Sequence, residues 1–509
     1  MSMDATTPSL QGRDVLVLGL GASGLAMARW CARAGANVTV ADTRDEPPGL
    51  PQLRADLPQV RFVAGAFDAA LVDGAQAVFR SPGLTPEQVA PVTQAAVAAG
   101  VPVGSELTLF TQALAALKAQ QGYAPAVLAV TGTNGKTTVT LLAAQLVERS
   151  GRTVAAAGNV GPTLLDTLAA RADANALPQV WVLELSSFQL DGVQDFEPTA
   201  ATVLNVSEDH LDWHGTMDAY AHAKSRIFGT RALMVLNRDD PLVLRMLPEP
   251  VKAKGGRMEQ REHVTFGDGM PQRPGDFGIE VVNGMAWLVR ALEADETQKR
   301  RKDEEVELHI QRLMPADALR IRGRHNAVNA LAALALAGAT GAQLGPMLYG
   351  LREYRGEPHR VEPVGFVHDV EYFDDSKGTN VGATLAALRG LGAERKVVAI
   401  LGGDGKGQAF APLADAVARF ARAIVLIGRD GGLIREALAS TGVPLLDAGS
   451  MEEAVRVAAQ RAHAGDAVLM SPACASFDMF RNYEHRADVF RAAVQALADE
   501  AGQDLGGSA

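Results

Sequence analysis

The segment Thr131–Thr138, which reads TGTNGKTT, constrains the fold of this chain more than any other feature of its sequence. It follows a short apolar run, Ala126–Val130, and precedes a stretch with helical spacing that continues to about Ser150. In such a strand–loop–helix context, backbone N–H groups of the loop and the positive end of the helix bind phosphate groups. The standard pattern GxxxxGK[ST] has glycine where this chain has Val130, so the match is to a shortened form, GTNGKT. The segment predicts a nucleoside triphosphate site in an α/β domain.

Two side chains of this loop have expected roles. Lys136 is placed to reach the β- and γ-phosphates, and the Thr137 hydroxyl is placed to bind Mg²⁺. The plainer alternative, a glycine turn with a surface lysine, is disfavoured by the strand before the loop and the helix after it. We predict that ATP is bound by Gly132, Thr133, Asn134, Gly135, Lys136, Thr137 and Thr138.

Short apolar runs alternate with helical stretches in three successive parts of the chain, a pattern typical of parallel sheets flanked by helices. The predicted strands are 14–18, 37–41, 75–79, 126–130, 180–185, 202–206, 233–237, 370–373, 396–401, 423–427, 443–446 and 467–470. At about 150 residues per domain, a chain of 509 residues is expected to form three. We predict an α/β fold with a Rossmann-like domain (1–106), a central P-loop ATPase-like domain (107–355) and a second Rossmann-like domain (356–509).

Composition excludes several classes of protein. The net charge is −11, whereas a general nucleic-acid binder needs a basic footprint. Cys31 and Cys474 lie far apart and form no CxxC pair, which excludes a disulfide scaffold and a cysteine-rich zinc site. We expect Cys474 to be a small packed residue, not a nucleophile. No apolar run approaches the roughly 18 residues of a membrane span, and the polar segment Met1–Gln11 lacks the apolar core of a signal peptide. We expect a soluble, cytoplasmic protein.

Two metal-type side chains follow the phosphate loop at the ends of predicted strands. Glu184 stands in LELSSFQL and His210 in EDHLD. Open α/β sheets bind their ligands at the carboxyl ends of strands, where a carboxylate and an imidazole can share a divalent ion with phosphate oxygens. Each residue also has a structural alternative. Glu184 could be a helix-capping or ion-paired carboxylate, and His210 could be a hydrogen-bonded structural histidine. The positions after the phosphate loop favour metal ligands.

Three other features of the central part leave alternatives open. Lys224 lies in a predicted helix, Asp218–Phe228, and from spacing alone it is a solvated surface lysine. Asn326 and Asn329 fall three apart on one helix face, where they suit either nucleotide binding or helix capping. The charged stretch 291–309 is interpreted as a solvated insertion or loop.

The first and last parts carry further glycine-rich or polar motifs after strands. Gly19–Gly24 (GLGASG) and Asp42 fulfil the dinucleotide fingerprint, which serves any diphosphate and does not by itself specify NAD. Ser81-Pro82-Gly83 is either a connector or part of the same pocket. GEPHR, DDSKGTN, GGDGKG and SPACASFD in the last part bring cations and hydroxyls to one sheet edge, which suits anionic ligands.

Taken together, TGTNGKTT, LELSSFQL and EDHLD resemble the motifs of the Mur ligases, ATP-dependent amide-forming enzymes that build the peptidoglycan precursor. GLGASG, DDSKGTN and SPACASFD make the chain most similar to members that add D-glutamate to UDP-N-acetylmuramoyl-L-alanine. A diaminopimelate- or lysine-adding relative would instead carry a C-terminal motif around Asn-Pro-Arg, which this sequence lacks. The resemblance covers nearly the whole chain, apart from 291–309.

The resemblance implies a monomer that binds the UDP-sugar in its first domain, ATP in its second, and ATP with D-glutamate in its third. It implies UDP-muramoyl contacts from Gly21, Ala22, Ser23, Asp42, Thr43, Arg44, Ser81, Gly83 and Asn159. It adds Asn326, Asn329, Arg360, Asp375 and Lys377 to the ATP site. It assigns D-glutamate to Thr379, Lys406, Ser476, Phe477 and Tyr483. The implied Mg²⁺ ligands are Thr137, Glu184, His210 and a CO₂-derived carbamate on Lys224, and the implied catalytic residues are Lys136, Lys224, His359 and Lys377.

Two rival functions use only part of the sequence. An NAD-dependent oxidoreductase would use the first glycine loop and Asp42, but it leaves the phosphate loop without a task. A P-loop motor or regulatory GTPase would use the phosphate loop, but it leaves the N-terminal domain without one.

Overall fold

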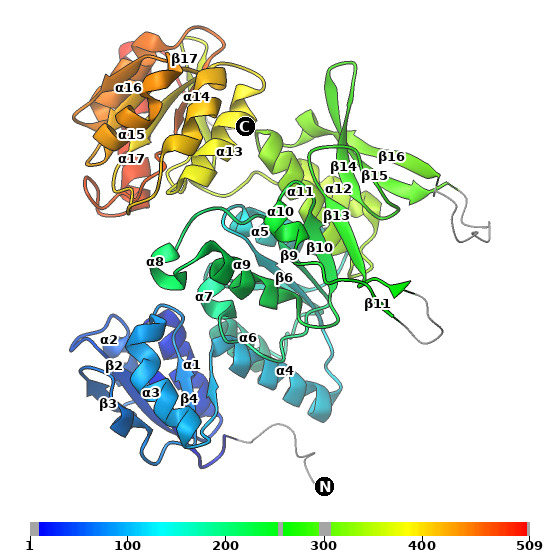
Figure 1. Ribbon diagram of the computed structural model, residues 1–509, viewed down its shortest axis with the longest axis vertical. Coiled ribbons are helices and arrows are strands. Elements are labelled where there is room, and N and C mark those ends of the chain that lie inside the picture. The colour runs from blue at the N-terminus through cyan, green and yellow to red at the C-terminus, as the bar shows by residue number, and fades with distance from the viewer. Residues whose placement is uncertain (1–9, 253–257, 295–306, 506–509) are drawn as a thin grey trace.

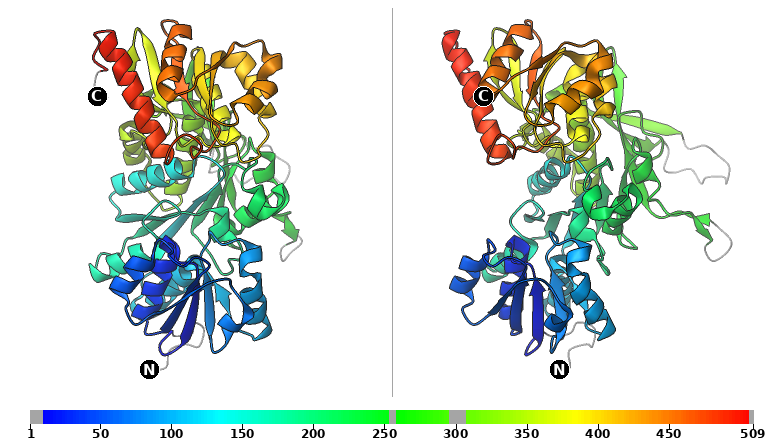
Figure 2. Two further views of the ribbon diagram at one scale, coloured as in Figure 1. Left: turned by 90° about the vertical axis from the view of Figure 1, so that its left-hand side faces the viewer. Right: turned by 60° about the vertical axis from the view of Figure 1, so that its left-hand side comes forward.

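The computed structural model describes residues 10–252, 258–294 and 307–505, and the chain forms three α/β units within them (Figure 1). The units follow one another along the long axis, with the N-terminal and C-terminal units at opposite ends in every view (Figures 1 and 2). The predicted α/β class is confirmed. Predictions that concern residues 1–9 and 295–306 lie outside the described residues. Among the residues that the structure describes, every helix is too short or too polar to span a lipid bilayer.

The N-terminal unit is built on a five-stranded parallel sheet of order β3-β2-β1-β4-β5. Its strands are β1 (Asp14–Leu18), β2 (Asn37–Asp42), β3 (Arg61–Ala64), β4 (Ala77–Arg80) and β5 (Val103–Gly104), and its helices are α1 (Ala22–Arg33), α2 (Leu50–Asp56) and α3 (Pro86–Ala98). The strand order reverses between β1 and β4, which opens a crevice at their carboxyl ends. Sequence patterns predicted β1, β2 and β4 but missed β3 and β5.

The central unit contains a six-stranded parallel sheet of order β13-β10-β9-β6-β8-β7. The strands are β6 (Ala126–Thr131), β7 (Val154–Gly158), β8 (Val180–Glu184), β9 (Ala200–Val203), β10 (Leu233–Asn237) and β13 (His263–Phe266). The helices are α4 (Glu106–Gln121), α5 (Lys136–Arg149), α6 (Leu164–Asp173), α7 (Ser187–Leu190), α8 (Leu211–His214), α9 (Met217–Ser225), α10 (Pro241–Leu244), α11 (Arg324–Gly338) and α12 (Leu344–Glu353). The strand predicted over 202–206 ends at Val203, because Asn205 turns away to hold the phosphate loop.

Antiparallel strands extend this unit on the side away from the parallel sheet's centre (Figure 1). They are β14 (Phe277–Val282), β15 (Met285–Glu293) and β16 (Leu308–Pro315), with a small hairpin of β11 (Val251–Lys252) and β12 (Met258–Glu259). The interpretation of 291–309 as a loop is wrong at both ends, because Ala291 pairs with Ile310 and Leu292 with His309. Backbone pairing and the burial of Ala291 outweigh the surrounding charges.

The C-terminal unit carries a six-stranded sheet of order β17-β18-β22-β19-β20-β21, in which only β17 is antiparallel to its neighbour. The strands are β17 (Glu362–Val367), β18 (Val370–Asp374), β19 (Val397–Gly402), β20 (Ala421–Ile427), β21 (Leu445–Asp447) and β22 (Ala467–Met470). The helices are α13 (Val381–Gly392), α14 (Ala414–Phe420), α15 (Gly431–Leu438), α16 (Met451–Arg461) and α17 (Tyr483–Glu500). The domain boundaries at 106 and 356 stay predictions.

One hydrophobic cluster joins the N-terminal and central units, which each have a further core of their own, whereas the C-terminal unit has separate cores. Buried Val15, Phe110 and Trp181 belong to a single apolar cluster that runs from the first sheet into the second. Ion pairs also connect the N-terminal and central units, including Arg33–Asp173 at 2.5 Å and Arg80–Asp191 at 2.7 Å. The cores of the C-terminal unit are separate. The described contacts between the phosphate loop and the C-terminal unit are polar, and the candidate site lies among them.

Candidate active site

The phosphate loop leaves the centre of the middle sheet and enters α5. Its backbone requires glycine twice, since φ is +155° at Gly132 and +83° at Gly135. The Lys136 ammonium folds back over the loop and donates to the carbonyl oxygens of Gly132 and Thr133, each at 2.9 Å. Burial lowers the pKa of Lys136, and the nearby Glu184 carboxylate opposes this. The loop therefore holds a desolvated cation over its own backbone.

Asn205, to which sequence reasoning gave no role, anchors the loop from the end of β9. Its Oδ1 accepts from the Asn134 N–H at 2.8 Å, and its Nδ2 donates to the Asn134 carbonyl at 3.1 Å. The Thr133 N–H donates to the Asn205 carbonyl at 2.9 Å. The only signal available was its place directly after a strand.

Glu184 presents an unpaired acceptor beside the loop. Strand pairing sets Val130 of β6 next to Glu184 of β8, so the carboxylate lies at the edge where the loop begins. The side chain is buried, and its Oε1 accepts from Asn159 Nδ2 at 2.8 Å. Its Oε2 is buried without a hydrogen-bond partner. A buried, unpaired carboxylate oxygen next to a phosphate loop fits a hard divalent cation.

His210 stands on the next strand-end segment, with backbone φ of +55°. Its Nε2 lies 3.7 Å from Asp209 Oδ2. Burial lowers the pKa of His210, which favours the neutral imidazole that can bind a metal. The donor set of Thr137, Glu184 and His210 fits Mg²⁺, although their roles as ligands stay predictions.

Lys224 is buried beneath the phosphate loop, so the default interpretation of a solvated surface lysine is wrong. Its ammonium donates to the Gly132 carbonyl at 2.9 Å and lies 4.4 Å from the centroid of the Tyr220 ring. Burial first, and the charge of Lys136 second, lower the pKa of Lys224 well below its ordinary value. Lys224 shares the buried face of α9 with Tyr220 and Ala223, and helix periodicity alone does not show that this face packs under the loop. A neutral amine is the form that reacts with CO₂.

A cavity of about 100 Å³ opens between the loop and the C-terminal unit. Its lining includes Asn134, Gly135, Thr138, Asn326, Asn329, Arg360, Asp375 and Lys377. The two asparagines share a face as predicted, with Asn329 Nδ2 donating to Asn326 Oδ1 at 3.1 Å. His325, which sequence reasoning missed, also lines the cavity, and its Nδ1 is buried without a partner. Burial lowers the pKa of His325 to about 4, so the ring is neutral.

The C-terminal unit contributes two cations and a carboxylate to this cavity. Arg360 Nη2 donates to Thr137 Oγ1 at 2.6 Å, directly across the boundary between the units. Lys377 Nζ lies 3.8 Å from the centroid of the Tyr483 ring, and burial followed by the charge of Arg360 lowers the pKa of Lys377. Asp375 accepts from Ser471 Oγ at 2.6 Å. These groups bring positive charge to the cavity beside the phosphate loop.

The Asp375 carboxyl makes a testable contribution to stability. Burial raises its pKa from 3.8 to about 7. The pKa of Asp375 is higher in the folded protein than in the unfolded chain, so ionisation lowers the free energy of unfolding. This loss of stability is absent below about pH 4, grows between pH 4 and 7, and is complete above pH 7. Asp375→Asn is therefore expected to raise the thermal unfolding midpoint at pH 8 and leave it unchanged at pH 4. The full cost corresponds to at most about 4 kcal/mol. Asp488→Asn, at an exposed position of α17, serves as the control, and an equal shift at both pH values would contradict the account.

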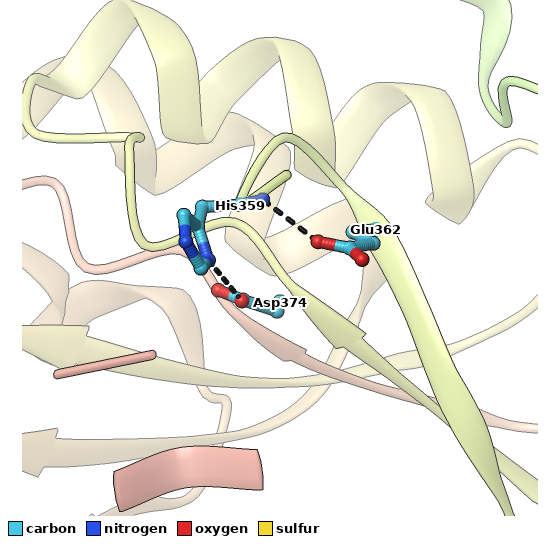
Figure 3. A group of neighbouring side chains, drawn as sticks. All are labelled: His359, Glu362 and Asp374. Atoms are coloured by element: carbon cyan, nitrogen blue, oxygen red, sulfur yellow. Dashed lines mark hydrogen bonds and ion pairs between the residues drawn. The ribbon is translucent and has the colours of Figure 1, made fainter. Parts of the chain in front are cut away.

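His359 lies in a hydrogen-bonded group rather than free in solvent (Figure 3). Its Nδ1 is 2.7 Å from Asp374 Oδ2, and its backbone N–H donates to Glu362 Oε2 at 2.8 Å. These three side chains are close enough to hold a metal ion, but Arg491 forms ion pairs with both carboxylates and already supplies the positive charge. The His359 ring lies 5.9 Å from that of Tyr483. Asp374 thus orients a histidine beside the predicted amino-acid pocket.

The residues predicted for D-glutamate come from loops after β18, β19 and β22, which are neighbouring strands. Ser476 is buried and Lys406 is exposed with φ of +51°. The Phe477 side chain is 71% exposed, so it does not wall off a pocket in this arrangement. Thr379 and Tyr483 complete the set, and all five roles stay predictions.

A buried arginine that sequence reasoning missed joins two of these loops. Arg486 donates to the Ser376 carbonyl at 2.8 Å and to the Cys474 carbonyl at 3.1 Å. Cys474 itself is buried and free, and burial raises its pKa to about 12. The expectation that Cys474 is a packed residue and no nucleophile is consistent with this environment.

In the N-terminal unit, Asp42 shapes the glycine loop from within. It is buried, and its oxygens accept from the Leu20 N–H at 2.6 Å and from Arg44 Nε at 2.8 Å. Ser81 Oγ donates to the Gly19 carbonyl at 3.0 Å. The other predicted UDP-substrate residues follow the same strand ends: Gly21, Ala22, Ser23, Thr43 and Gly83. The Asn159 side chain donates to Glu184 Oε1, and its role in binding the UDP substrate stays a prediction.

Comparison with known proteins places these features in one family. Three family models match in order: the MurD-like N-terminal domain of Mur ligases over 13–105, the Mur ligase middle domain over 130–337, and the Mur ligase glutamate ligase domain over 359–474. The chain is 67% identical to a UDP-N-acetylmuramoylalanine–D-glutamate ligase of Albidiferax ferrireducens, over 98% of this chain and 99% of that protein. A protein of the same name from Polaromonas is 60% identical over 97% of this chain and 99% of its own length.

Solved structures resemble the chain in fold. The MurF ligase of Thermotoga maritima in complex with ADP has a TM-score of 0.56 at 17% identity and covers 96% of this chain and 97% of its own. MurF from Acinetobacter baumannii has a TM-score of 0.54 at 18% identity over 95% and 92%. With three matching models in order and relatives of such identity over nearly its full length, the chain belongs to the Mur ligase family.

Proposed function

We propose that this chain is an ATP-dependent ligase that joins D-glutamate to UDP-N-acetylmuramoyl-L-alanine in peptidoglycan precursor synthesis. One observation carries the proposal: Lys136 and the buried Lys224 from the central unit meet Arg360 of the C-terminal unit at a single phosphate loop. The names of the relatives that match nearly the whole chain support the choice of D-glutamate. We include in the proposal that the protein is cytoplasmic and monomeric and binds no nucleic acid.

The first step activates a carboxylate. A carboxylate is a poor acylating agent, so the L-alanine carboxylate oxygen of the UDP substrate attacks the γ-phosphorus of ATP, and ADP leaves. The product is an acyl phosphate. Transfer between two anions needs cations on the phosphoryl oxygens. Lys136 and Arg360 supply two of them by exchanging their present partners, the loop carbonyls and the Thr137 hydroxyl, for phosphate.

A bound Mg²⁺ would neutralise charge on the phosphates during this step. Thr137, Glu184 and His210 would hold it, and the unpaired Oε2 of Glu184 offers a ligand atom. Lys224 as a carbamate would add an anion on the same side of the loop. That modification converts a buried amine into a carboxylate-like anion next to Lys136.

The second step forms the amide. The amine of D-glutamate first loses a proton to solvent and then attacks the acyl carbon, and phosphate leaves from the tetrahedral intermediate as the bond between the acyl carbon and the phosphate oxygen breaks. The C-terminal loops hold the two carboxylates of the amino acid, with Lys406 as a cation and Thr379 and Ser476 as hydroxyl donors. His359 and Lys377 face this region beside the Tyr483 ring.

Lys406→Ala is expected to raise the KM for D-glutamate strongly while leaving the KM for the UDP substrate nearly unchanged. A charge-assisted hydrogen bond contributes roughly 1.5–3 kcal/mol, which corresponds to about a 10- to 150-fold effect. Steady-state kinetics with each substrate varied in turn measure it. Lys396→Ala, at an exposed lysine of the same unit, is the control. Equal losses for both substrates would remove Lys406 from the amino-acid pocket.

The N-terminal unit is expected to bind the UDP substrate and not NAD. The Gly19–Gly24 loop at the start of α1 suits a diphosphate, but Asp42, the acid of the fingerprint, is already engaged with Leu20 and Arg44. Calorimetric titration should show saturable binding of the UDP substrate that NAD does not displace. Competitive displacement by NAD would favour the oxidoreductase alternative.

The proposed chemistry is tested by following an oxygen atom. With ¹⁸O in the L-alanine carboxylate, an acyl phosphate route transfers one labelled oxygen to the released phosphate. Mass spectrometry of the phosphate should detect one label for each amide formed. Unlabelled phosphate with normal amide yield would exclude the acyl phosphate.

A further inference from the structure

Asn380 makes side-chain contacts from the C-terminal unit with the phosphate loop itself. Its Nδ2 donates to Asn134 Oδ1 at 3.2 Å, and Asn134 Nδ2 donates back to Asn380 Oδ1 at the same distance. The same Nδ2 lies 3.2 Å from Asp209 Oδ2, next to His210. Asn380 is only 8% exposed. The Asn380 amide thus links the C-terminal unit to the phosphate loop and to Asp209, the neighbour of the proposed metal ligand His210.

On its own side, Asn380 begins the helix that follows the proposed D-glutamate residue Thr379. Its Oδ1 accepts from the Ala383 N–H at 2.8 Å and caps α13. The adjacent Val381 N–H donates to Gln408 Oε1 at 2.9 Å, and Gln408 Nε2 donates to the Ala473 carbonyl at 2.8 Å. Gln408 stands two residues after Lys406. Hydrogen bonds therefore run from the phosphate loop through Asn380 to the three loops that carry the D-glutamate pocket.

Gly382 brings α13 close enough for these bonds to form. A Cβ at this position would lie 2.6 Å from Ser207 Oγ and 3.1 Å from Asn134 Nδ2. Ser207 Oγ is buried without a partner, so the surfaces already meet there. Gly382 lies inside a helix, where alanine is otherwise favourable. Glycine at this position therefore allows the two units to approach each other, and it does not stabilise the helix.

We propose that Asn380 is a positioning residue that holds the D-glutamate loops in register with the phosphate loop, so that the acyl phosphate meets the amine before it meets water. This rests on the proposed function. When the register is lost, water attacks the acyl carbon, the bond to the phosphate oxygen breaks, and the substrate carboxylate is regenerated with release of phosphate. The net result is ATP hydrolysis without amide formation.

The signature is a changed ratio of products. For Asn380→Ser, which keeps a capping hydroxyl but cannot reach Asn134, we expect a kcat/KM for D-glutamate about 10-fold lower, a typical size for coupled contacts. Phosphate released for each amide should rise from about one to well above it, and the KM for the UDP substrate should stay unchanged. Gly382→Ala should act in the same direction by sterics. Gly432→Ala, in α15 with open space around it, is the matched control.

A double-mutant cycle separates this role from general destabilisation. If the amide pair acts as a unit, Asn134→Ala and Asn380→Ala together should lower kcat/KM for D-glutamate less than the product of their separate effects. Additive losses, or a phosphate-to-amide ratio near one in both Asn380→Ser and Gly382→Ala, would overturn the proposal. If the wild-type protein forms no amide with D-glutamate, the proposed function fails instead.

Discussion

Replacing Lys136 with alanine is expected to abolish amide formation while leaving binding of the UDP substrate largely intact. The ammonium is the loop's own cation and lies 2.9 Å from two loop carbonyls, the partners that the proposed mechanism exchanges for phosphate oxygens. Losing a preorganised contact to the transferred phosphoryl group costs on the order of 3 kcal/mol or more of barrier stabilisation, a factor of at least about 100 in kcat. Coupled ADP release and titration of the UDP substrate measure the two halves of this prediction.

Lys252→Ala, at an exposed lysine of β11, provides the control for the loss of one positive charge. It should behave as wild type in both measurements. Ligation by Lys136→Ala at a rate near that of the wild type would remove Lys136 from the reaction.

The second large effect is expected at Lys224, whose alanine variant should be nearly inactive. If the lysine acts as a carbamate, alanine removes an anion from the metal side of the phosphate loop. Short carboxylic acids such as acetate or formate should then restore part of the activity by occupying the vacated space beneath Gly132, which the Lys224 ammonium now contacts at 2.9 Å. Activity as a function of added acid measures this rescue.

The effect of added carboxylic acid on Lys224→Ala is compared with its effect on Lys136→Ala. Lys136→Ala lacks a cation, so carboxylic acids should not restore its activity. Intact mass of the wild-type protein in bicarbonate should show the added CO₂. A fully active protein with an unmodified Lys224 would contradict the carbamate, and it would leave the rest of the site unchanged.

The parts of the site that sequence predicts well are those set by local chain geometry. An apolar run before GTNGKT and helical spacing after it are enough to place Lys136 at the start of α5. The positions of Glu184 and His210 beside the loop could be predicted because they stand at and after the ends of β8 and β9, the two neighbours of β6, whereas their roles as metal ligands stay predictions. The fold class follows from the same alternation.

Long-range packing is what the sequence leaves open. Nothing in the spacing of α9 shows that Lys224 is buried, because its partner, Gly132, is 92 residues away. The Arg360–Thr137 contact spans 223 residues, and Asn380 meets Asn134 across 246. Such pairs depend on how the units dock and leave no local pattern. The sheet of β14 to β16 was also missed, and the charges of 291–309 obscure only the end of β15 and the start of β16.

The central claim is tested most directly by ADP release with a panel of amino acids and UDP-muramoyl acceptors. D-glutamate presents two carboxylates and an amine in one stereochemical arrangement, so its enantiomer must either misplace the amine or leave a carboxylate unpaired. ADP release is expected to require both UDP-N-acetylmuramoyl-L-alanine and D-glutamate, with one amide formed for each ADP. Equally efficient use of L-glutamate, glycine or a diamino acid would contradict it.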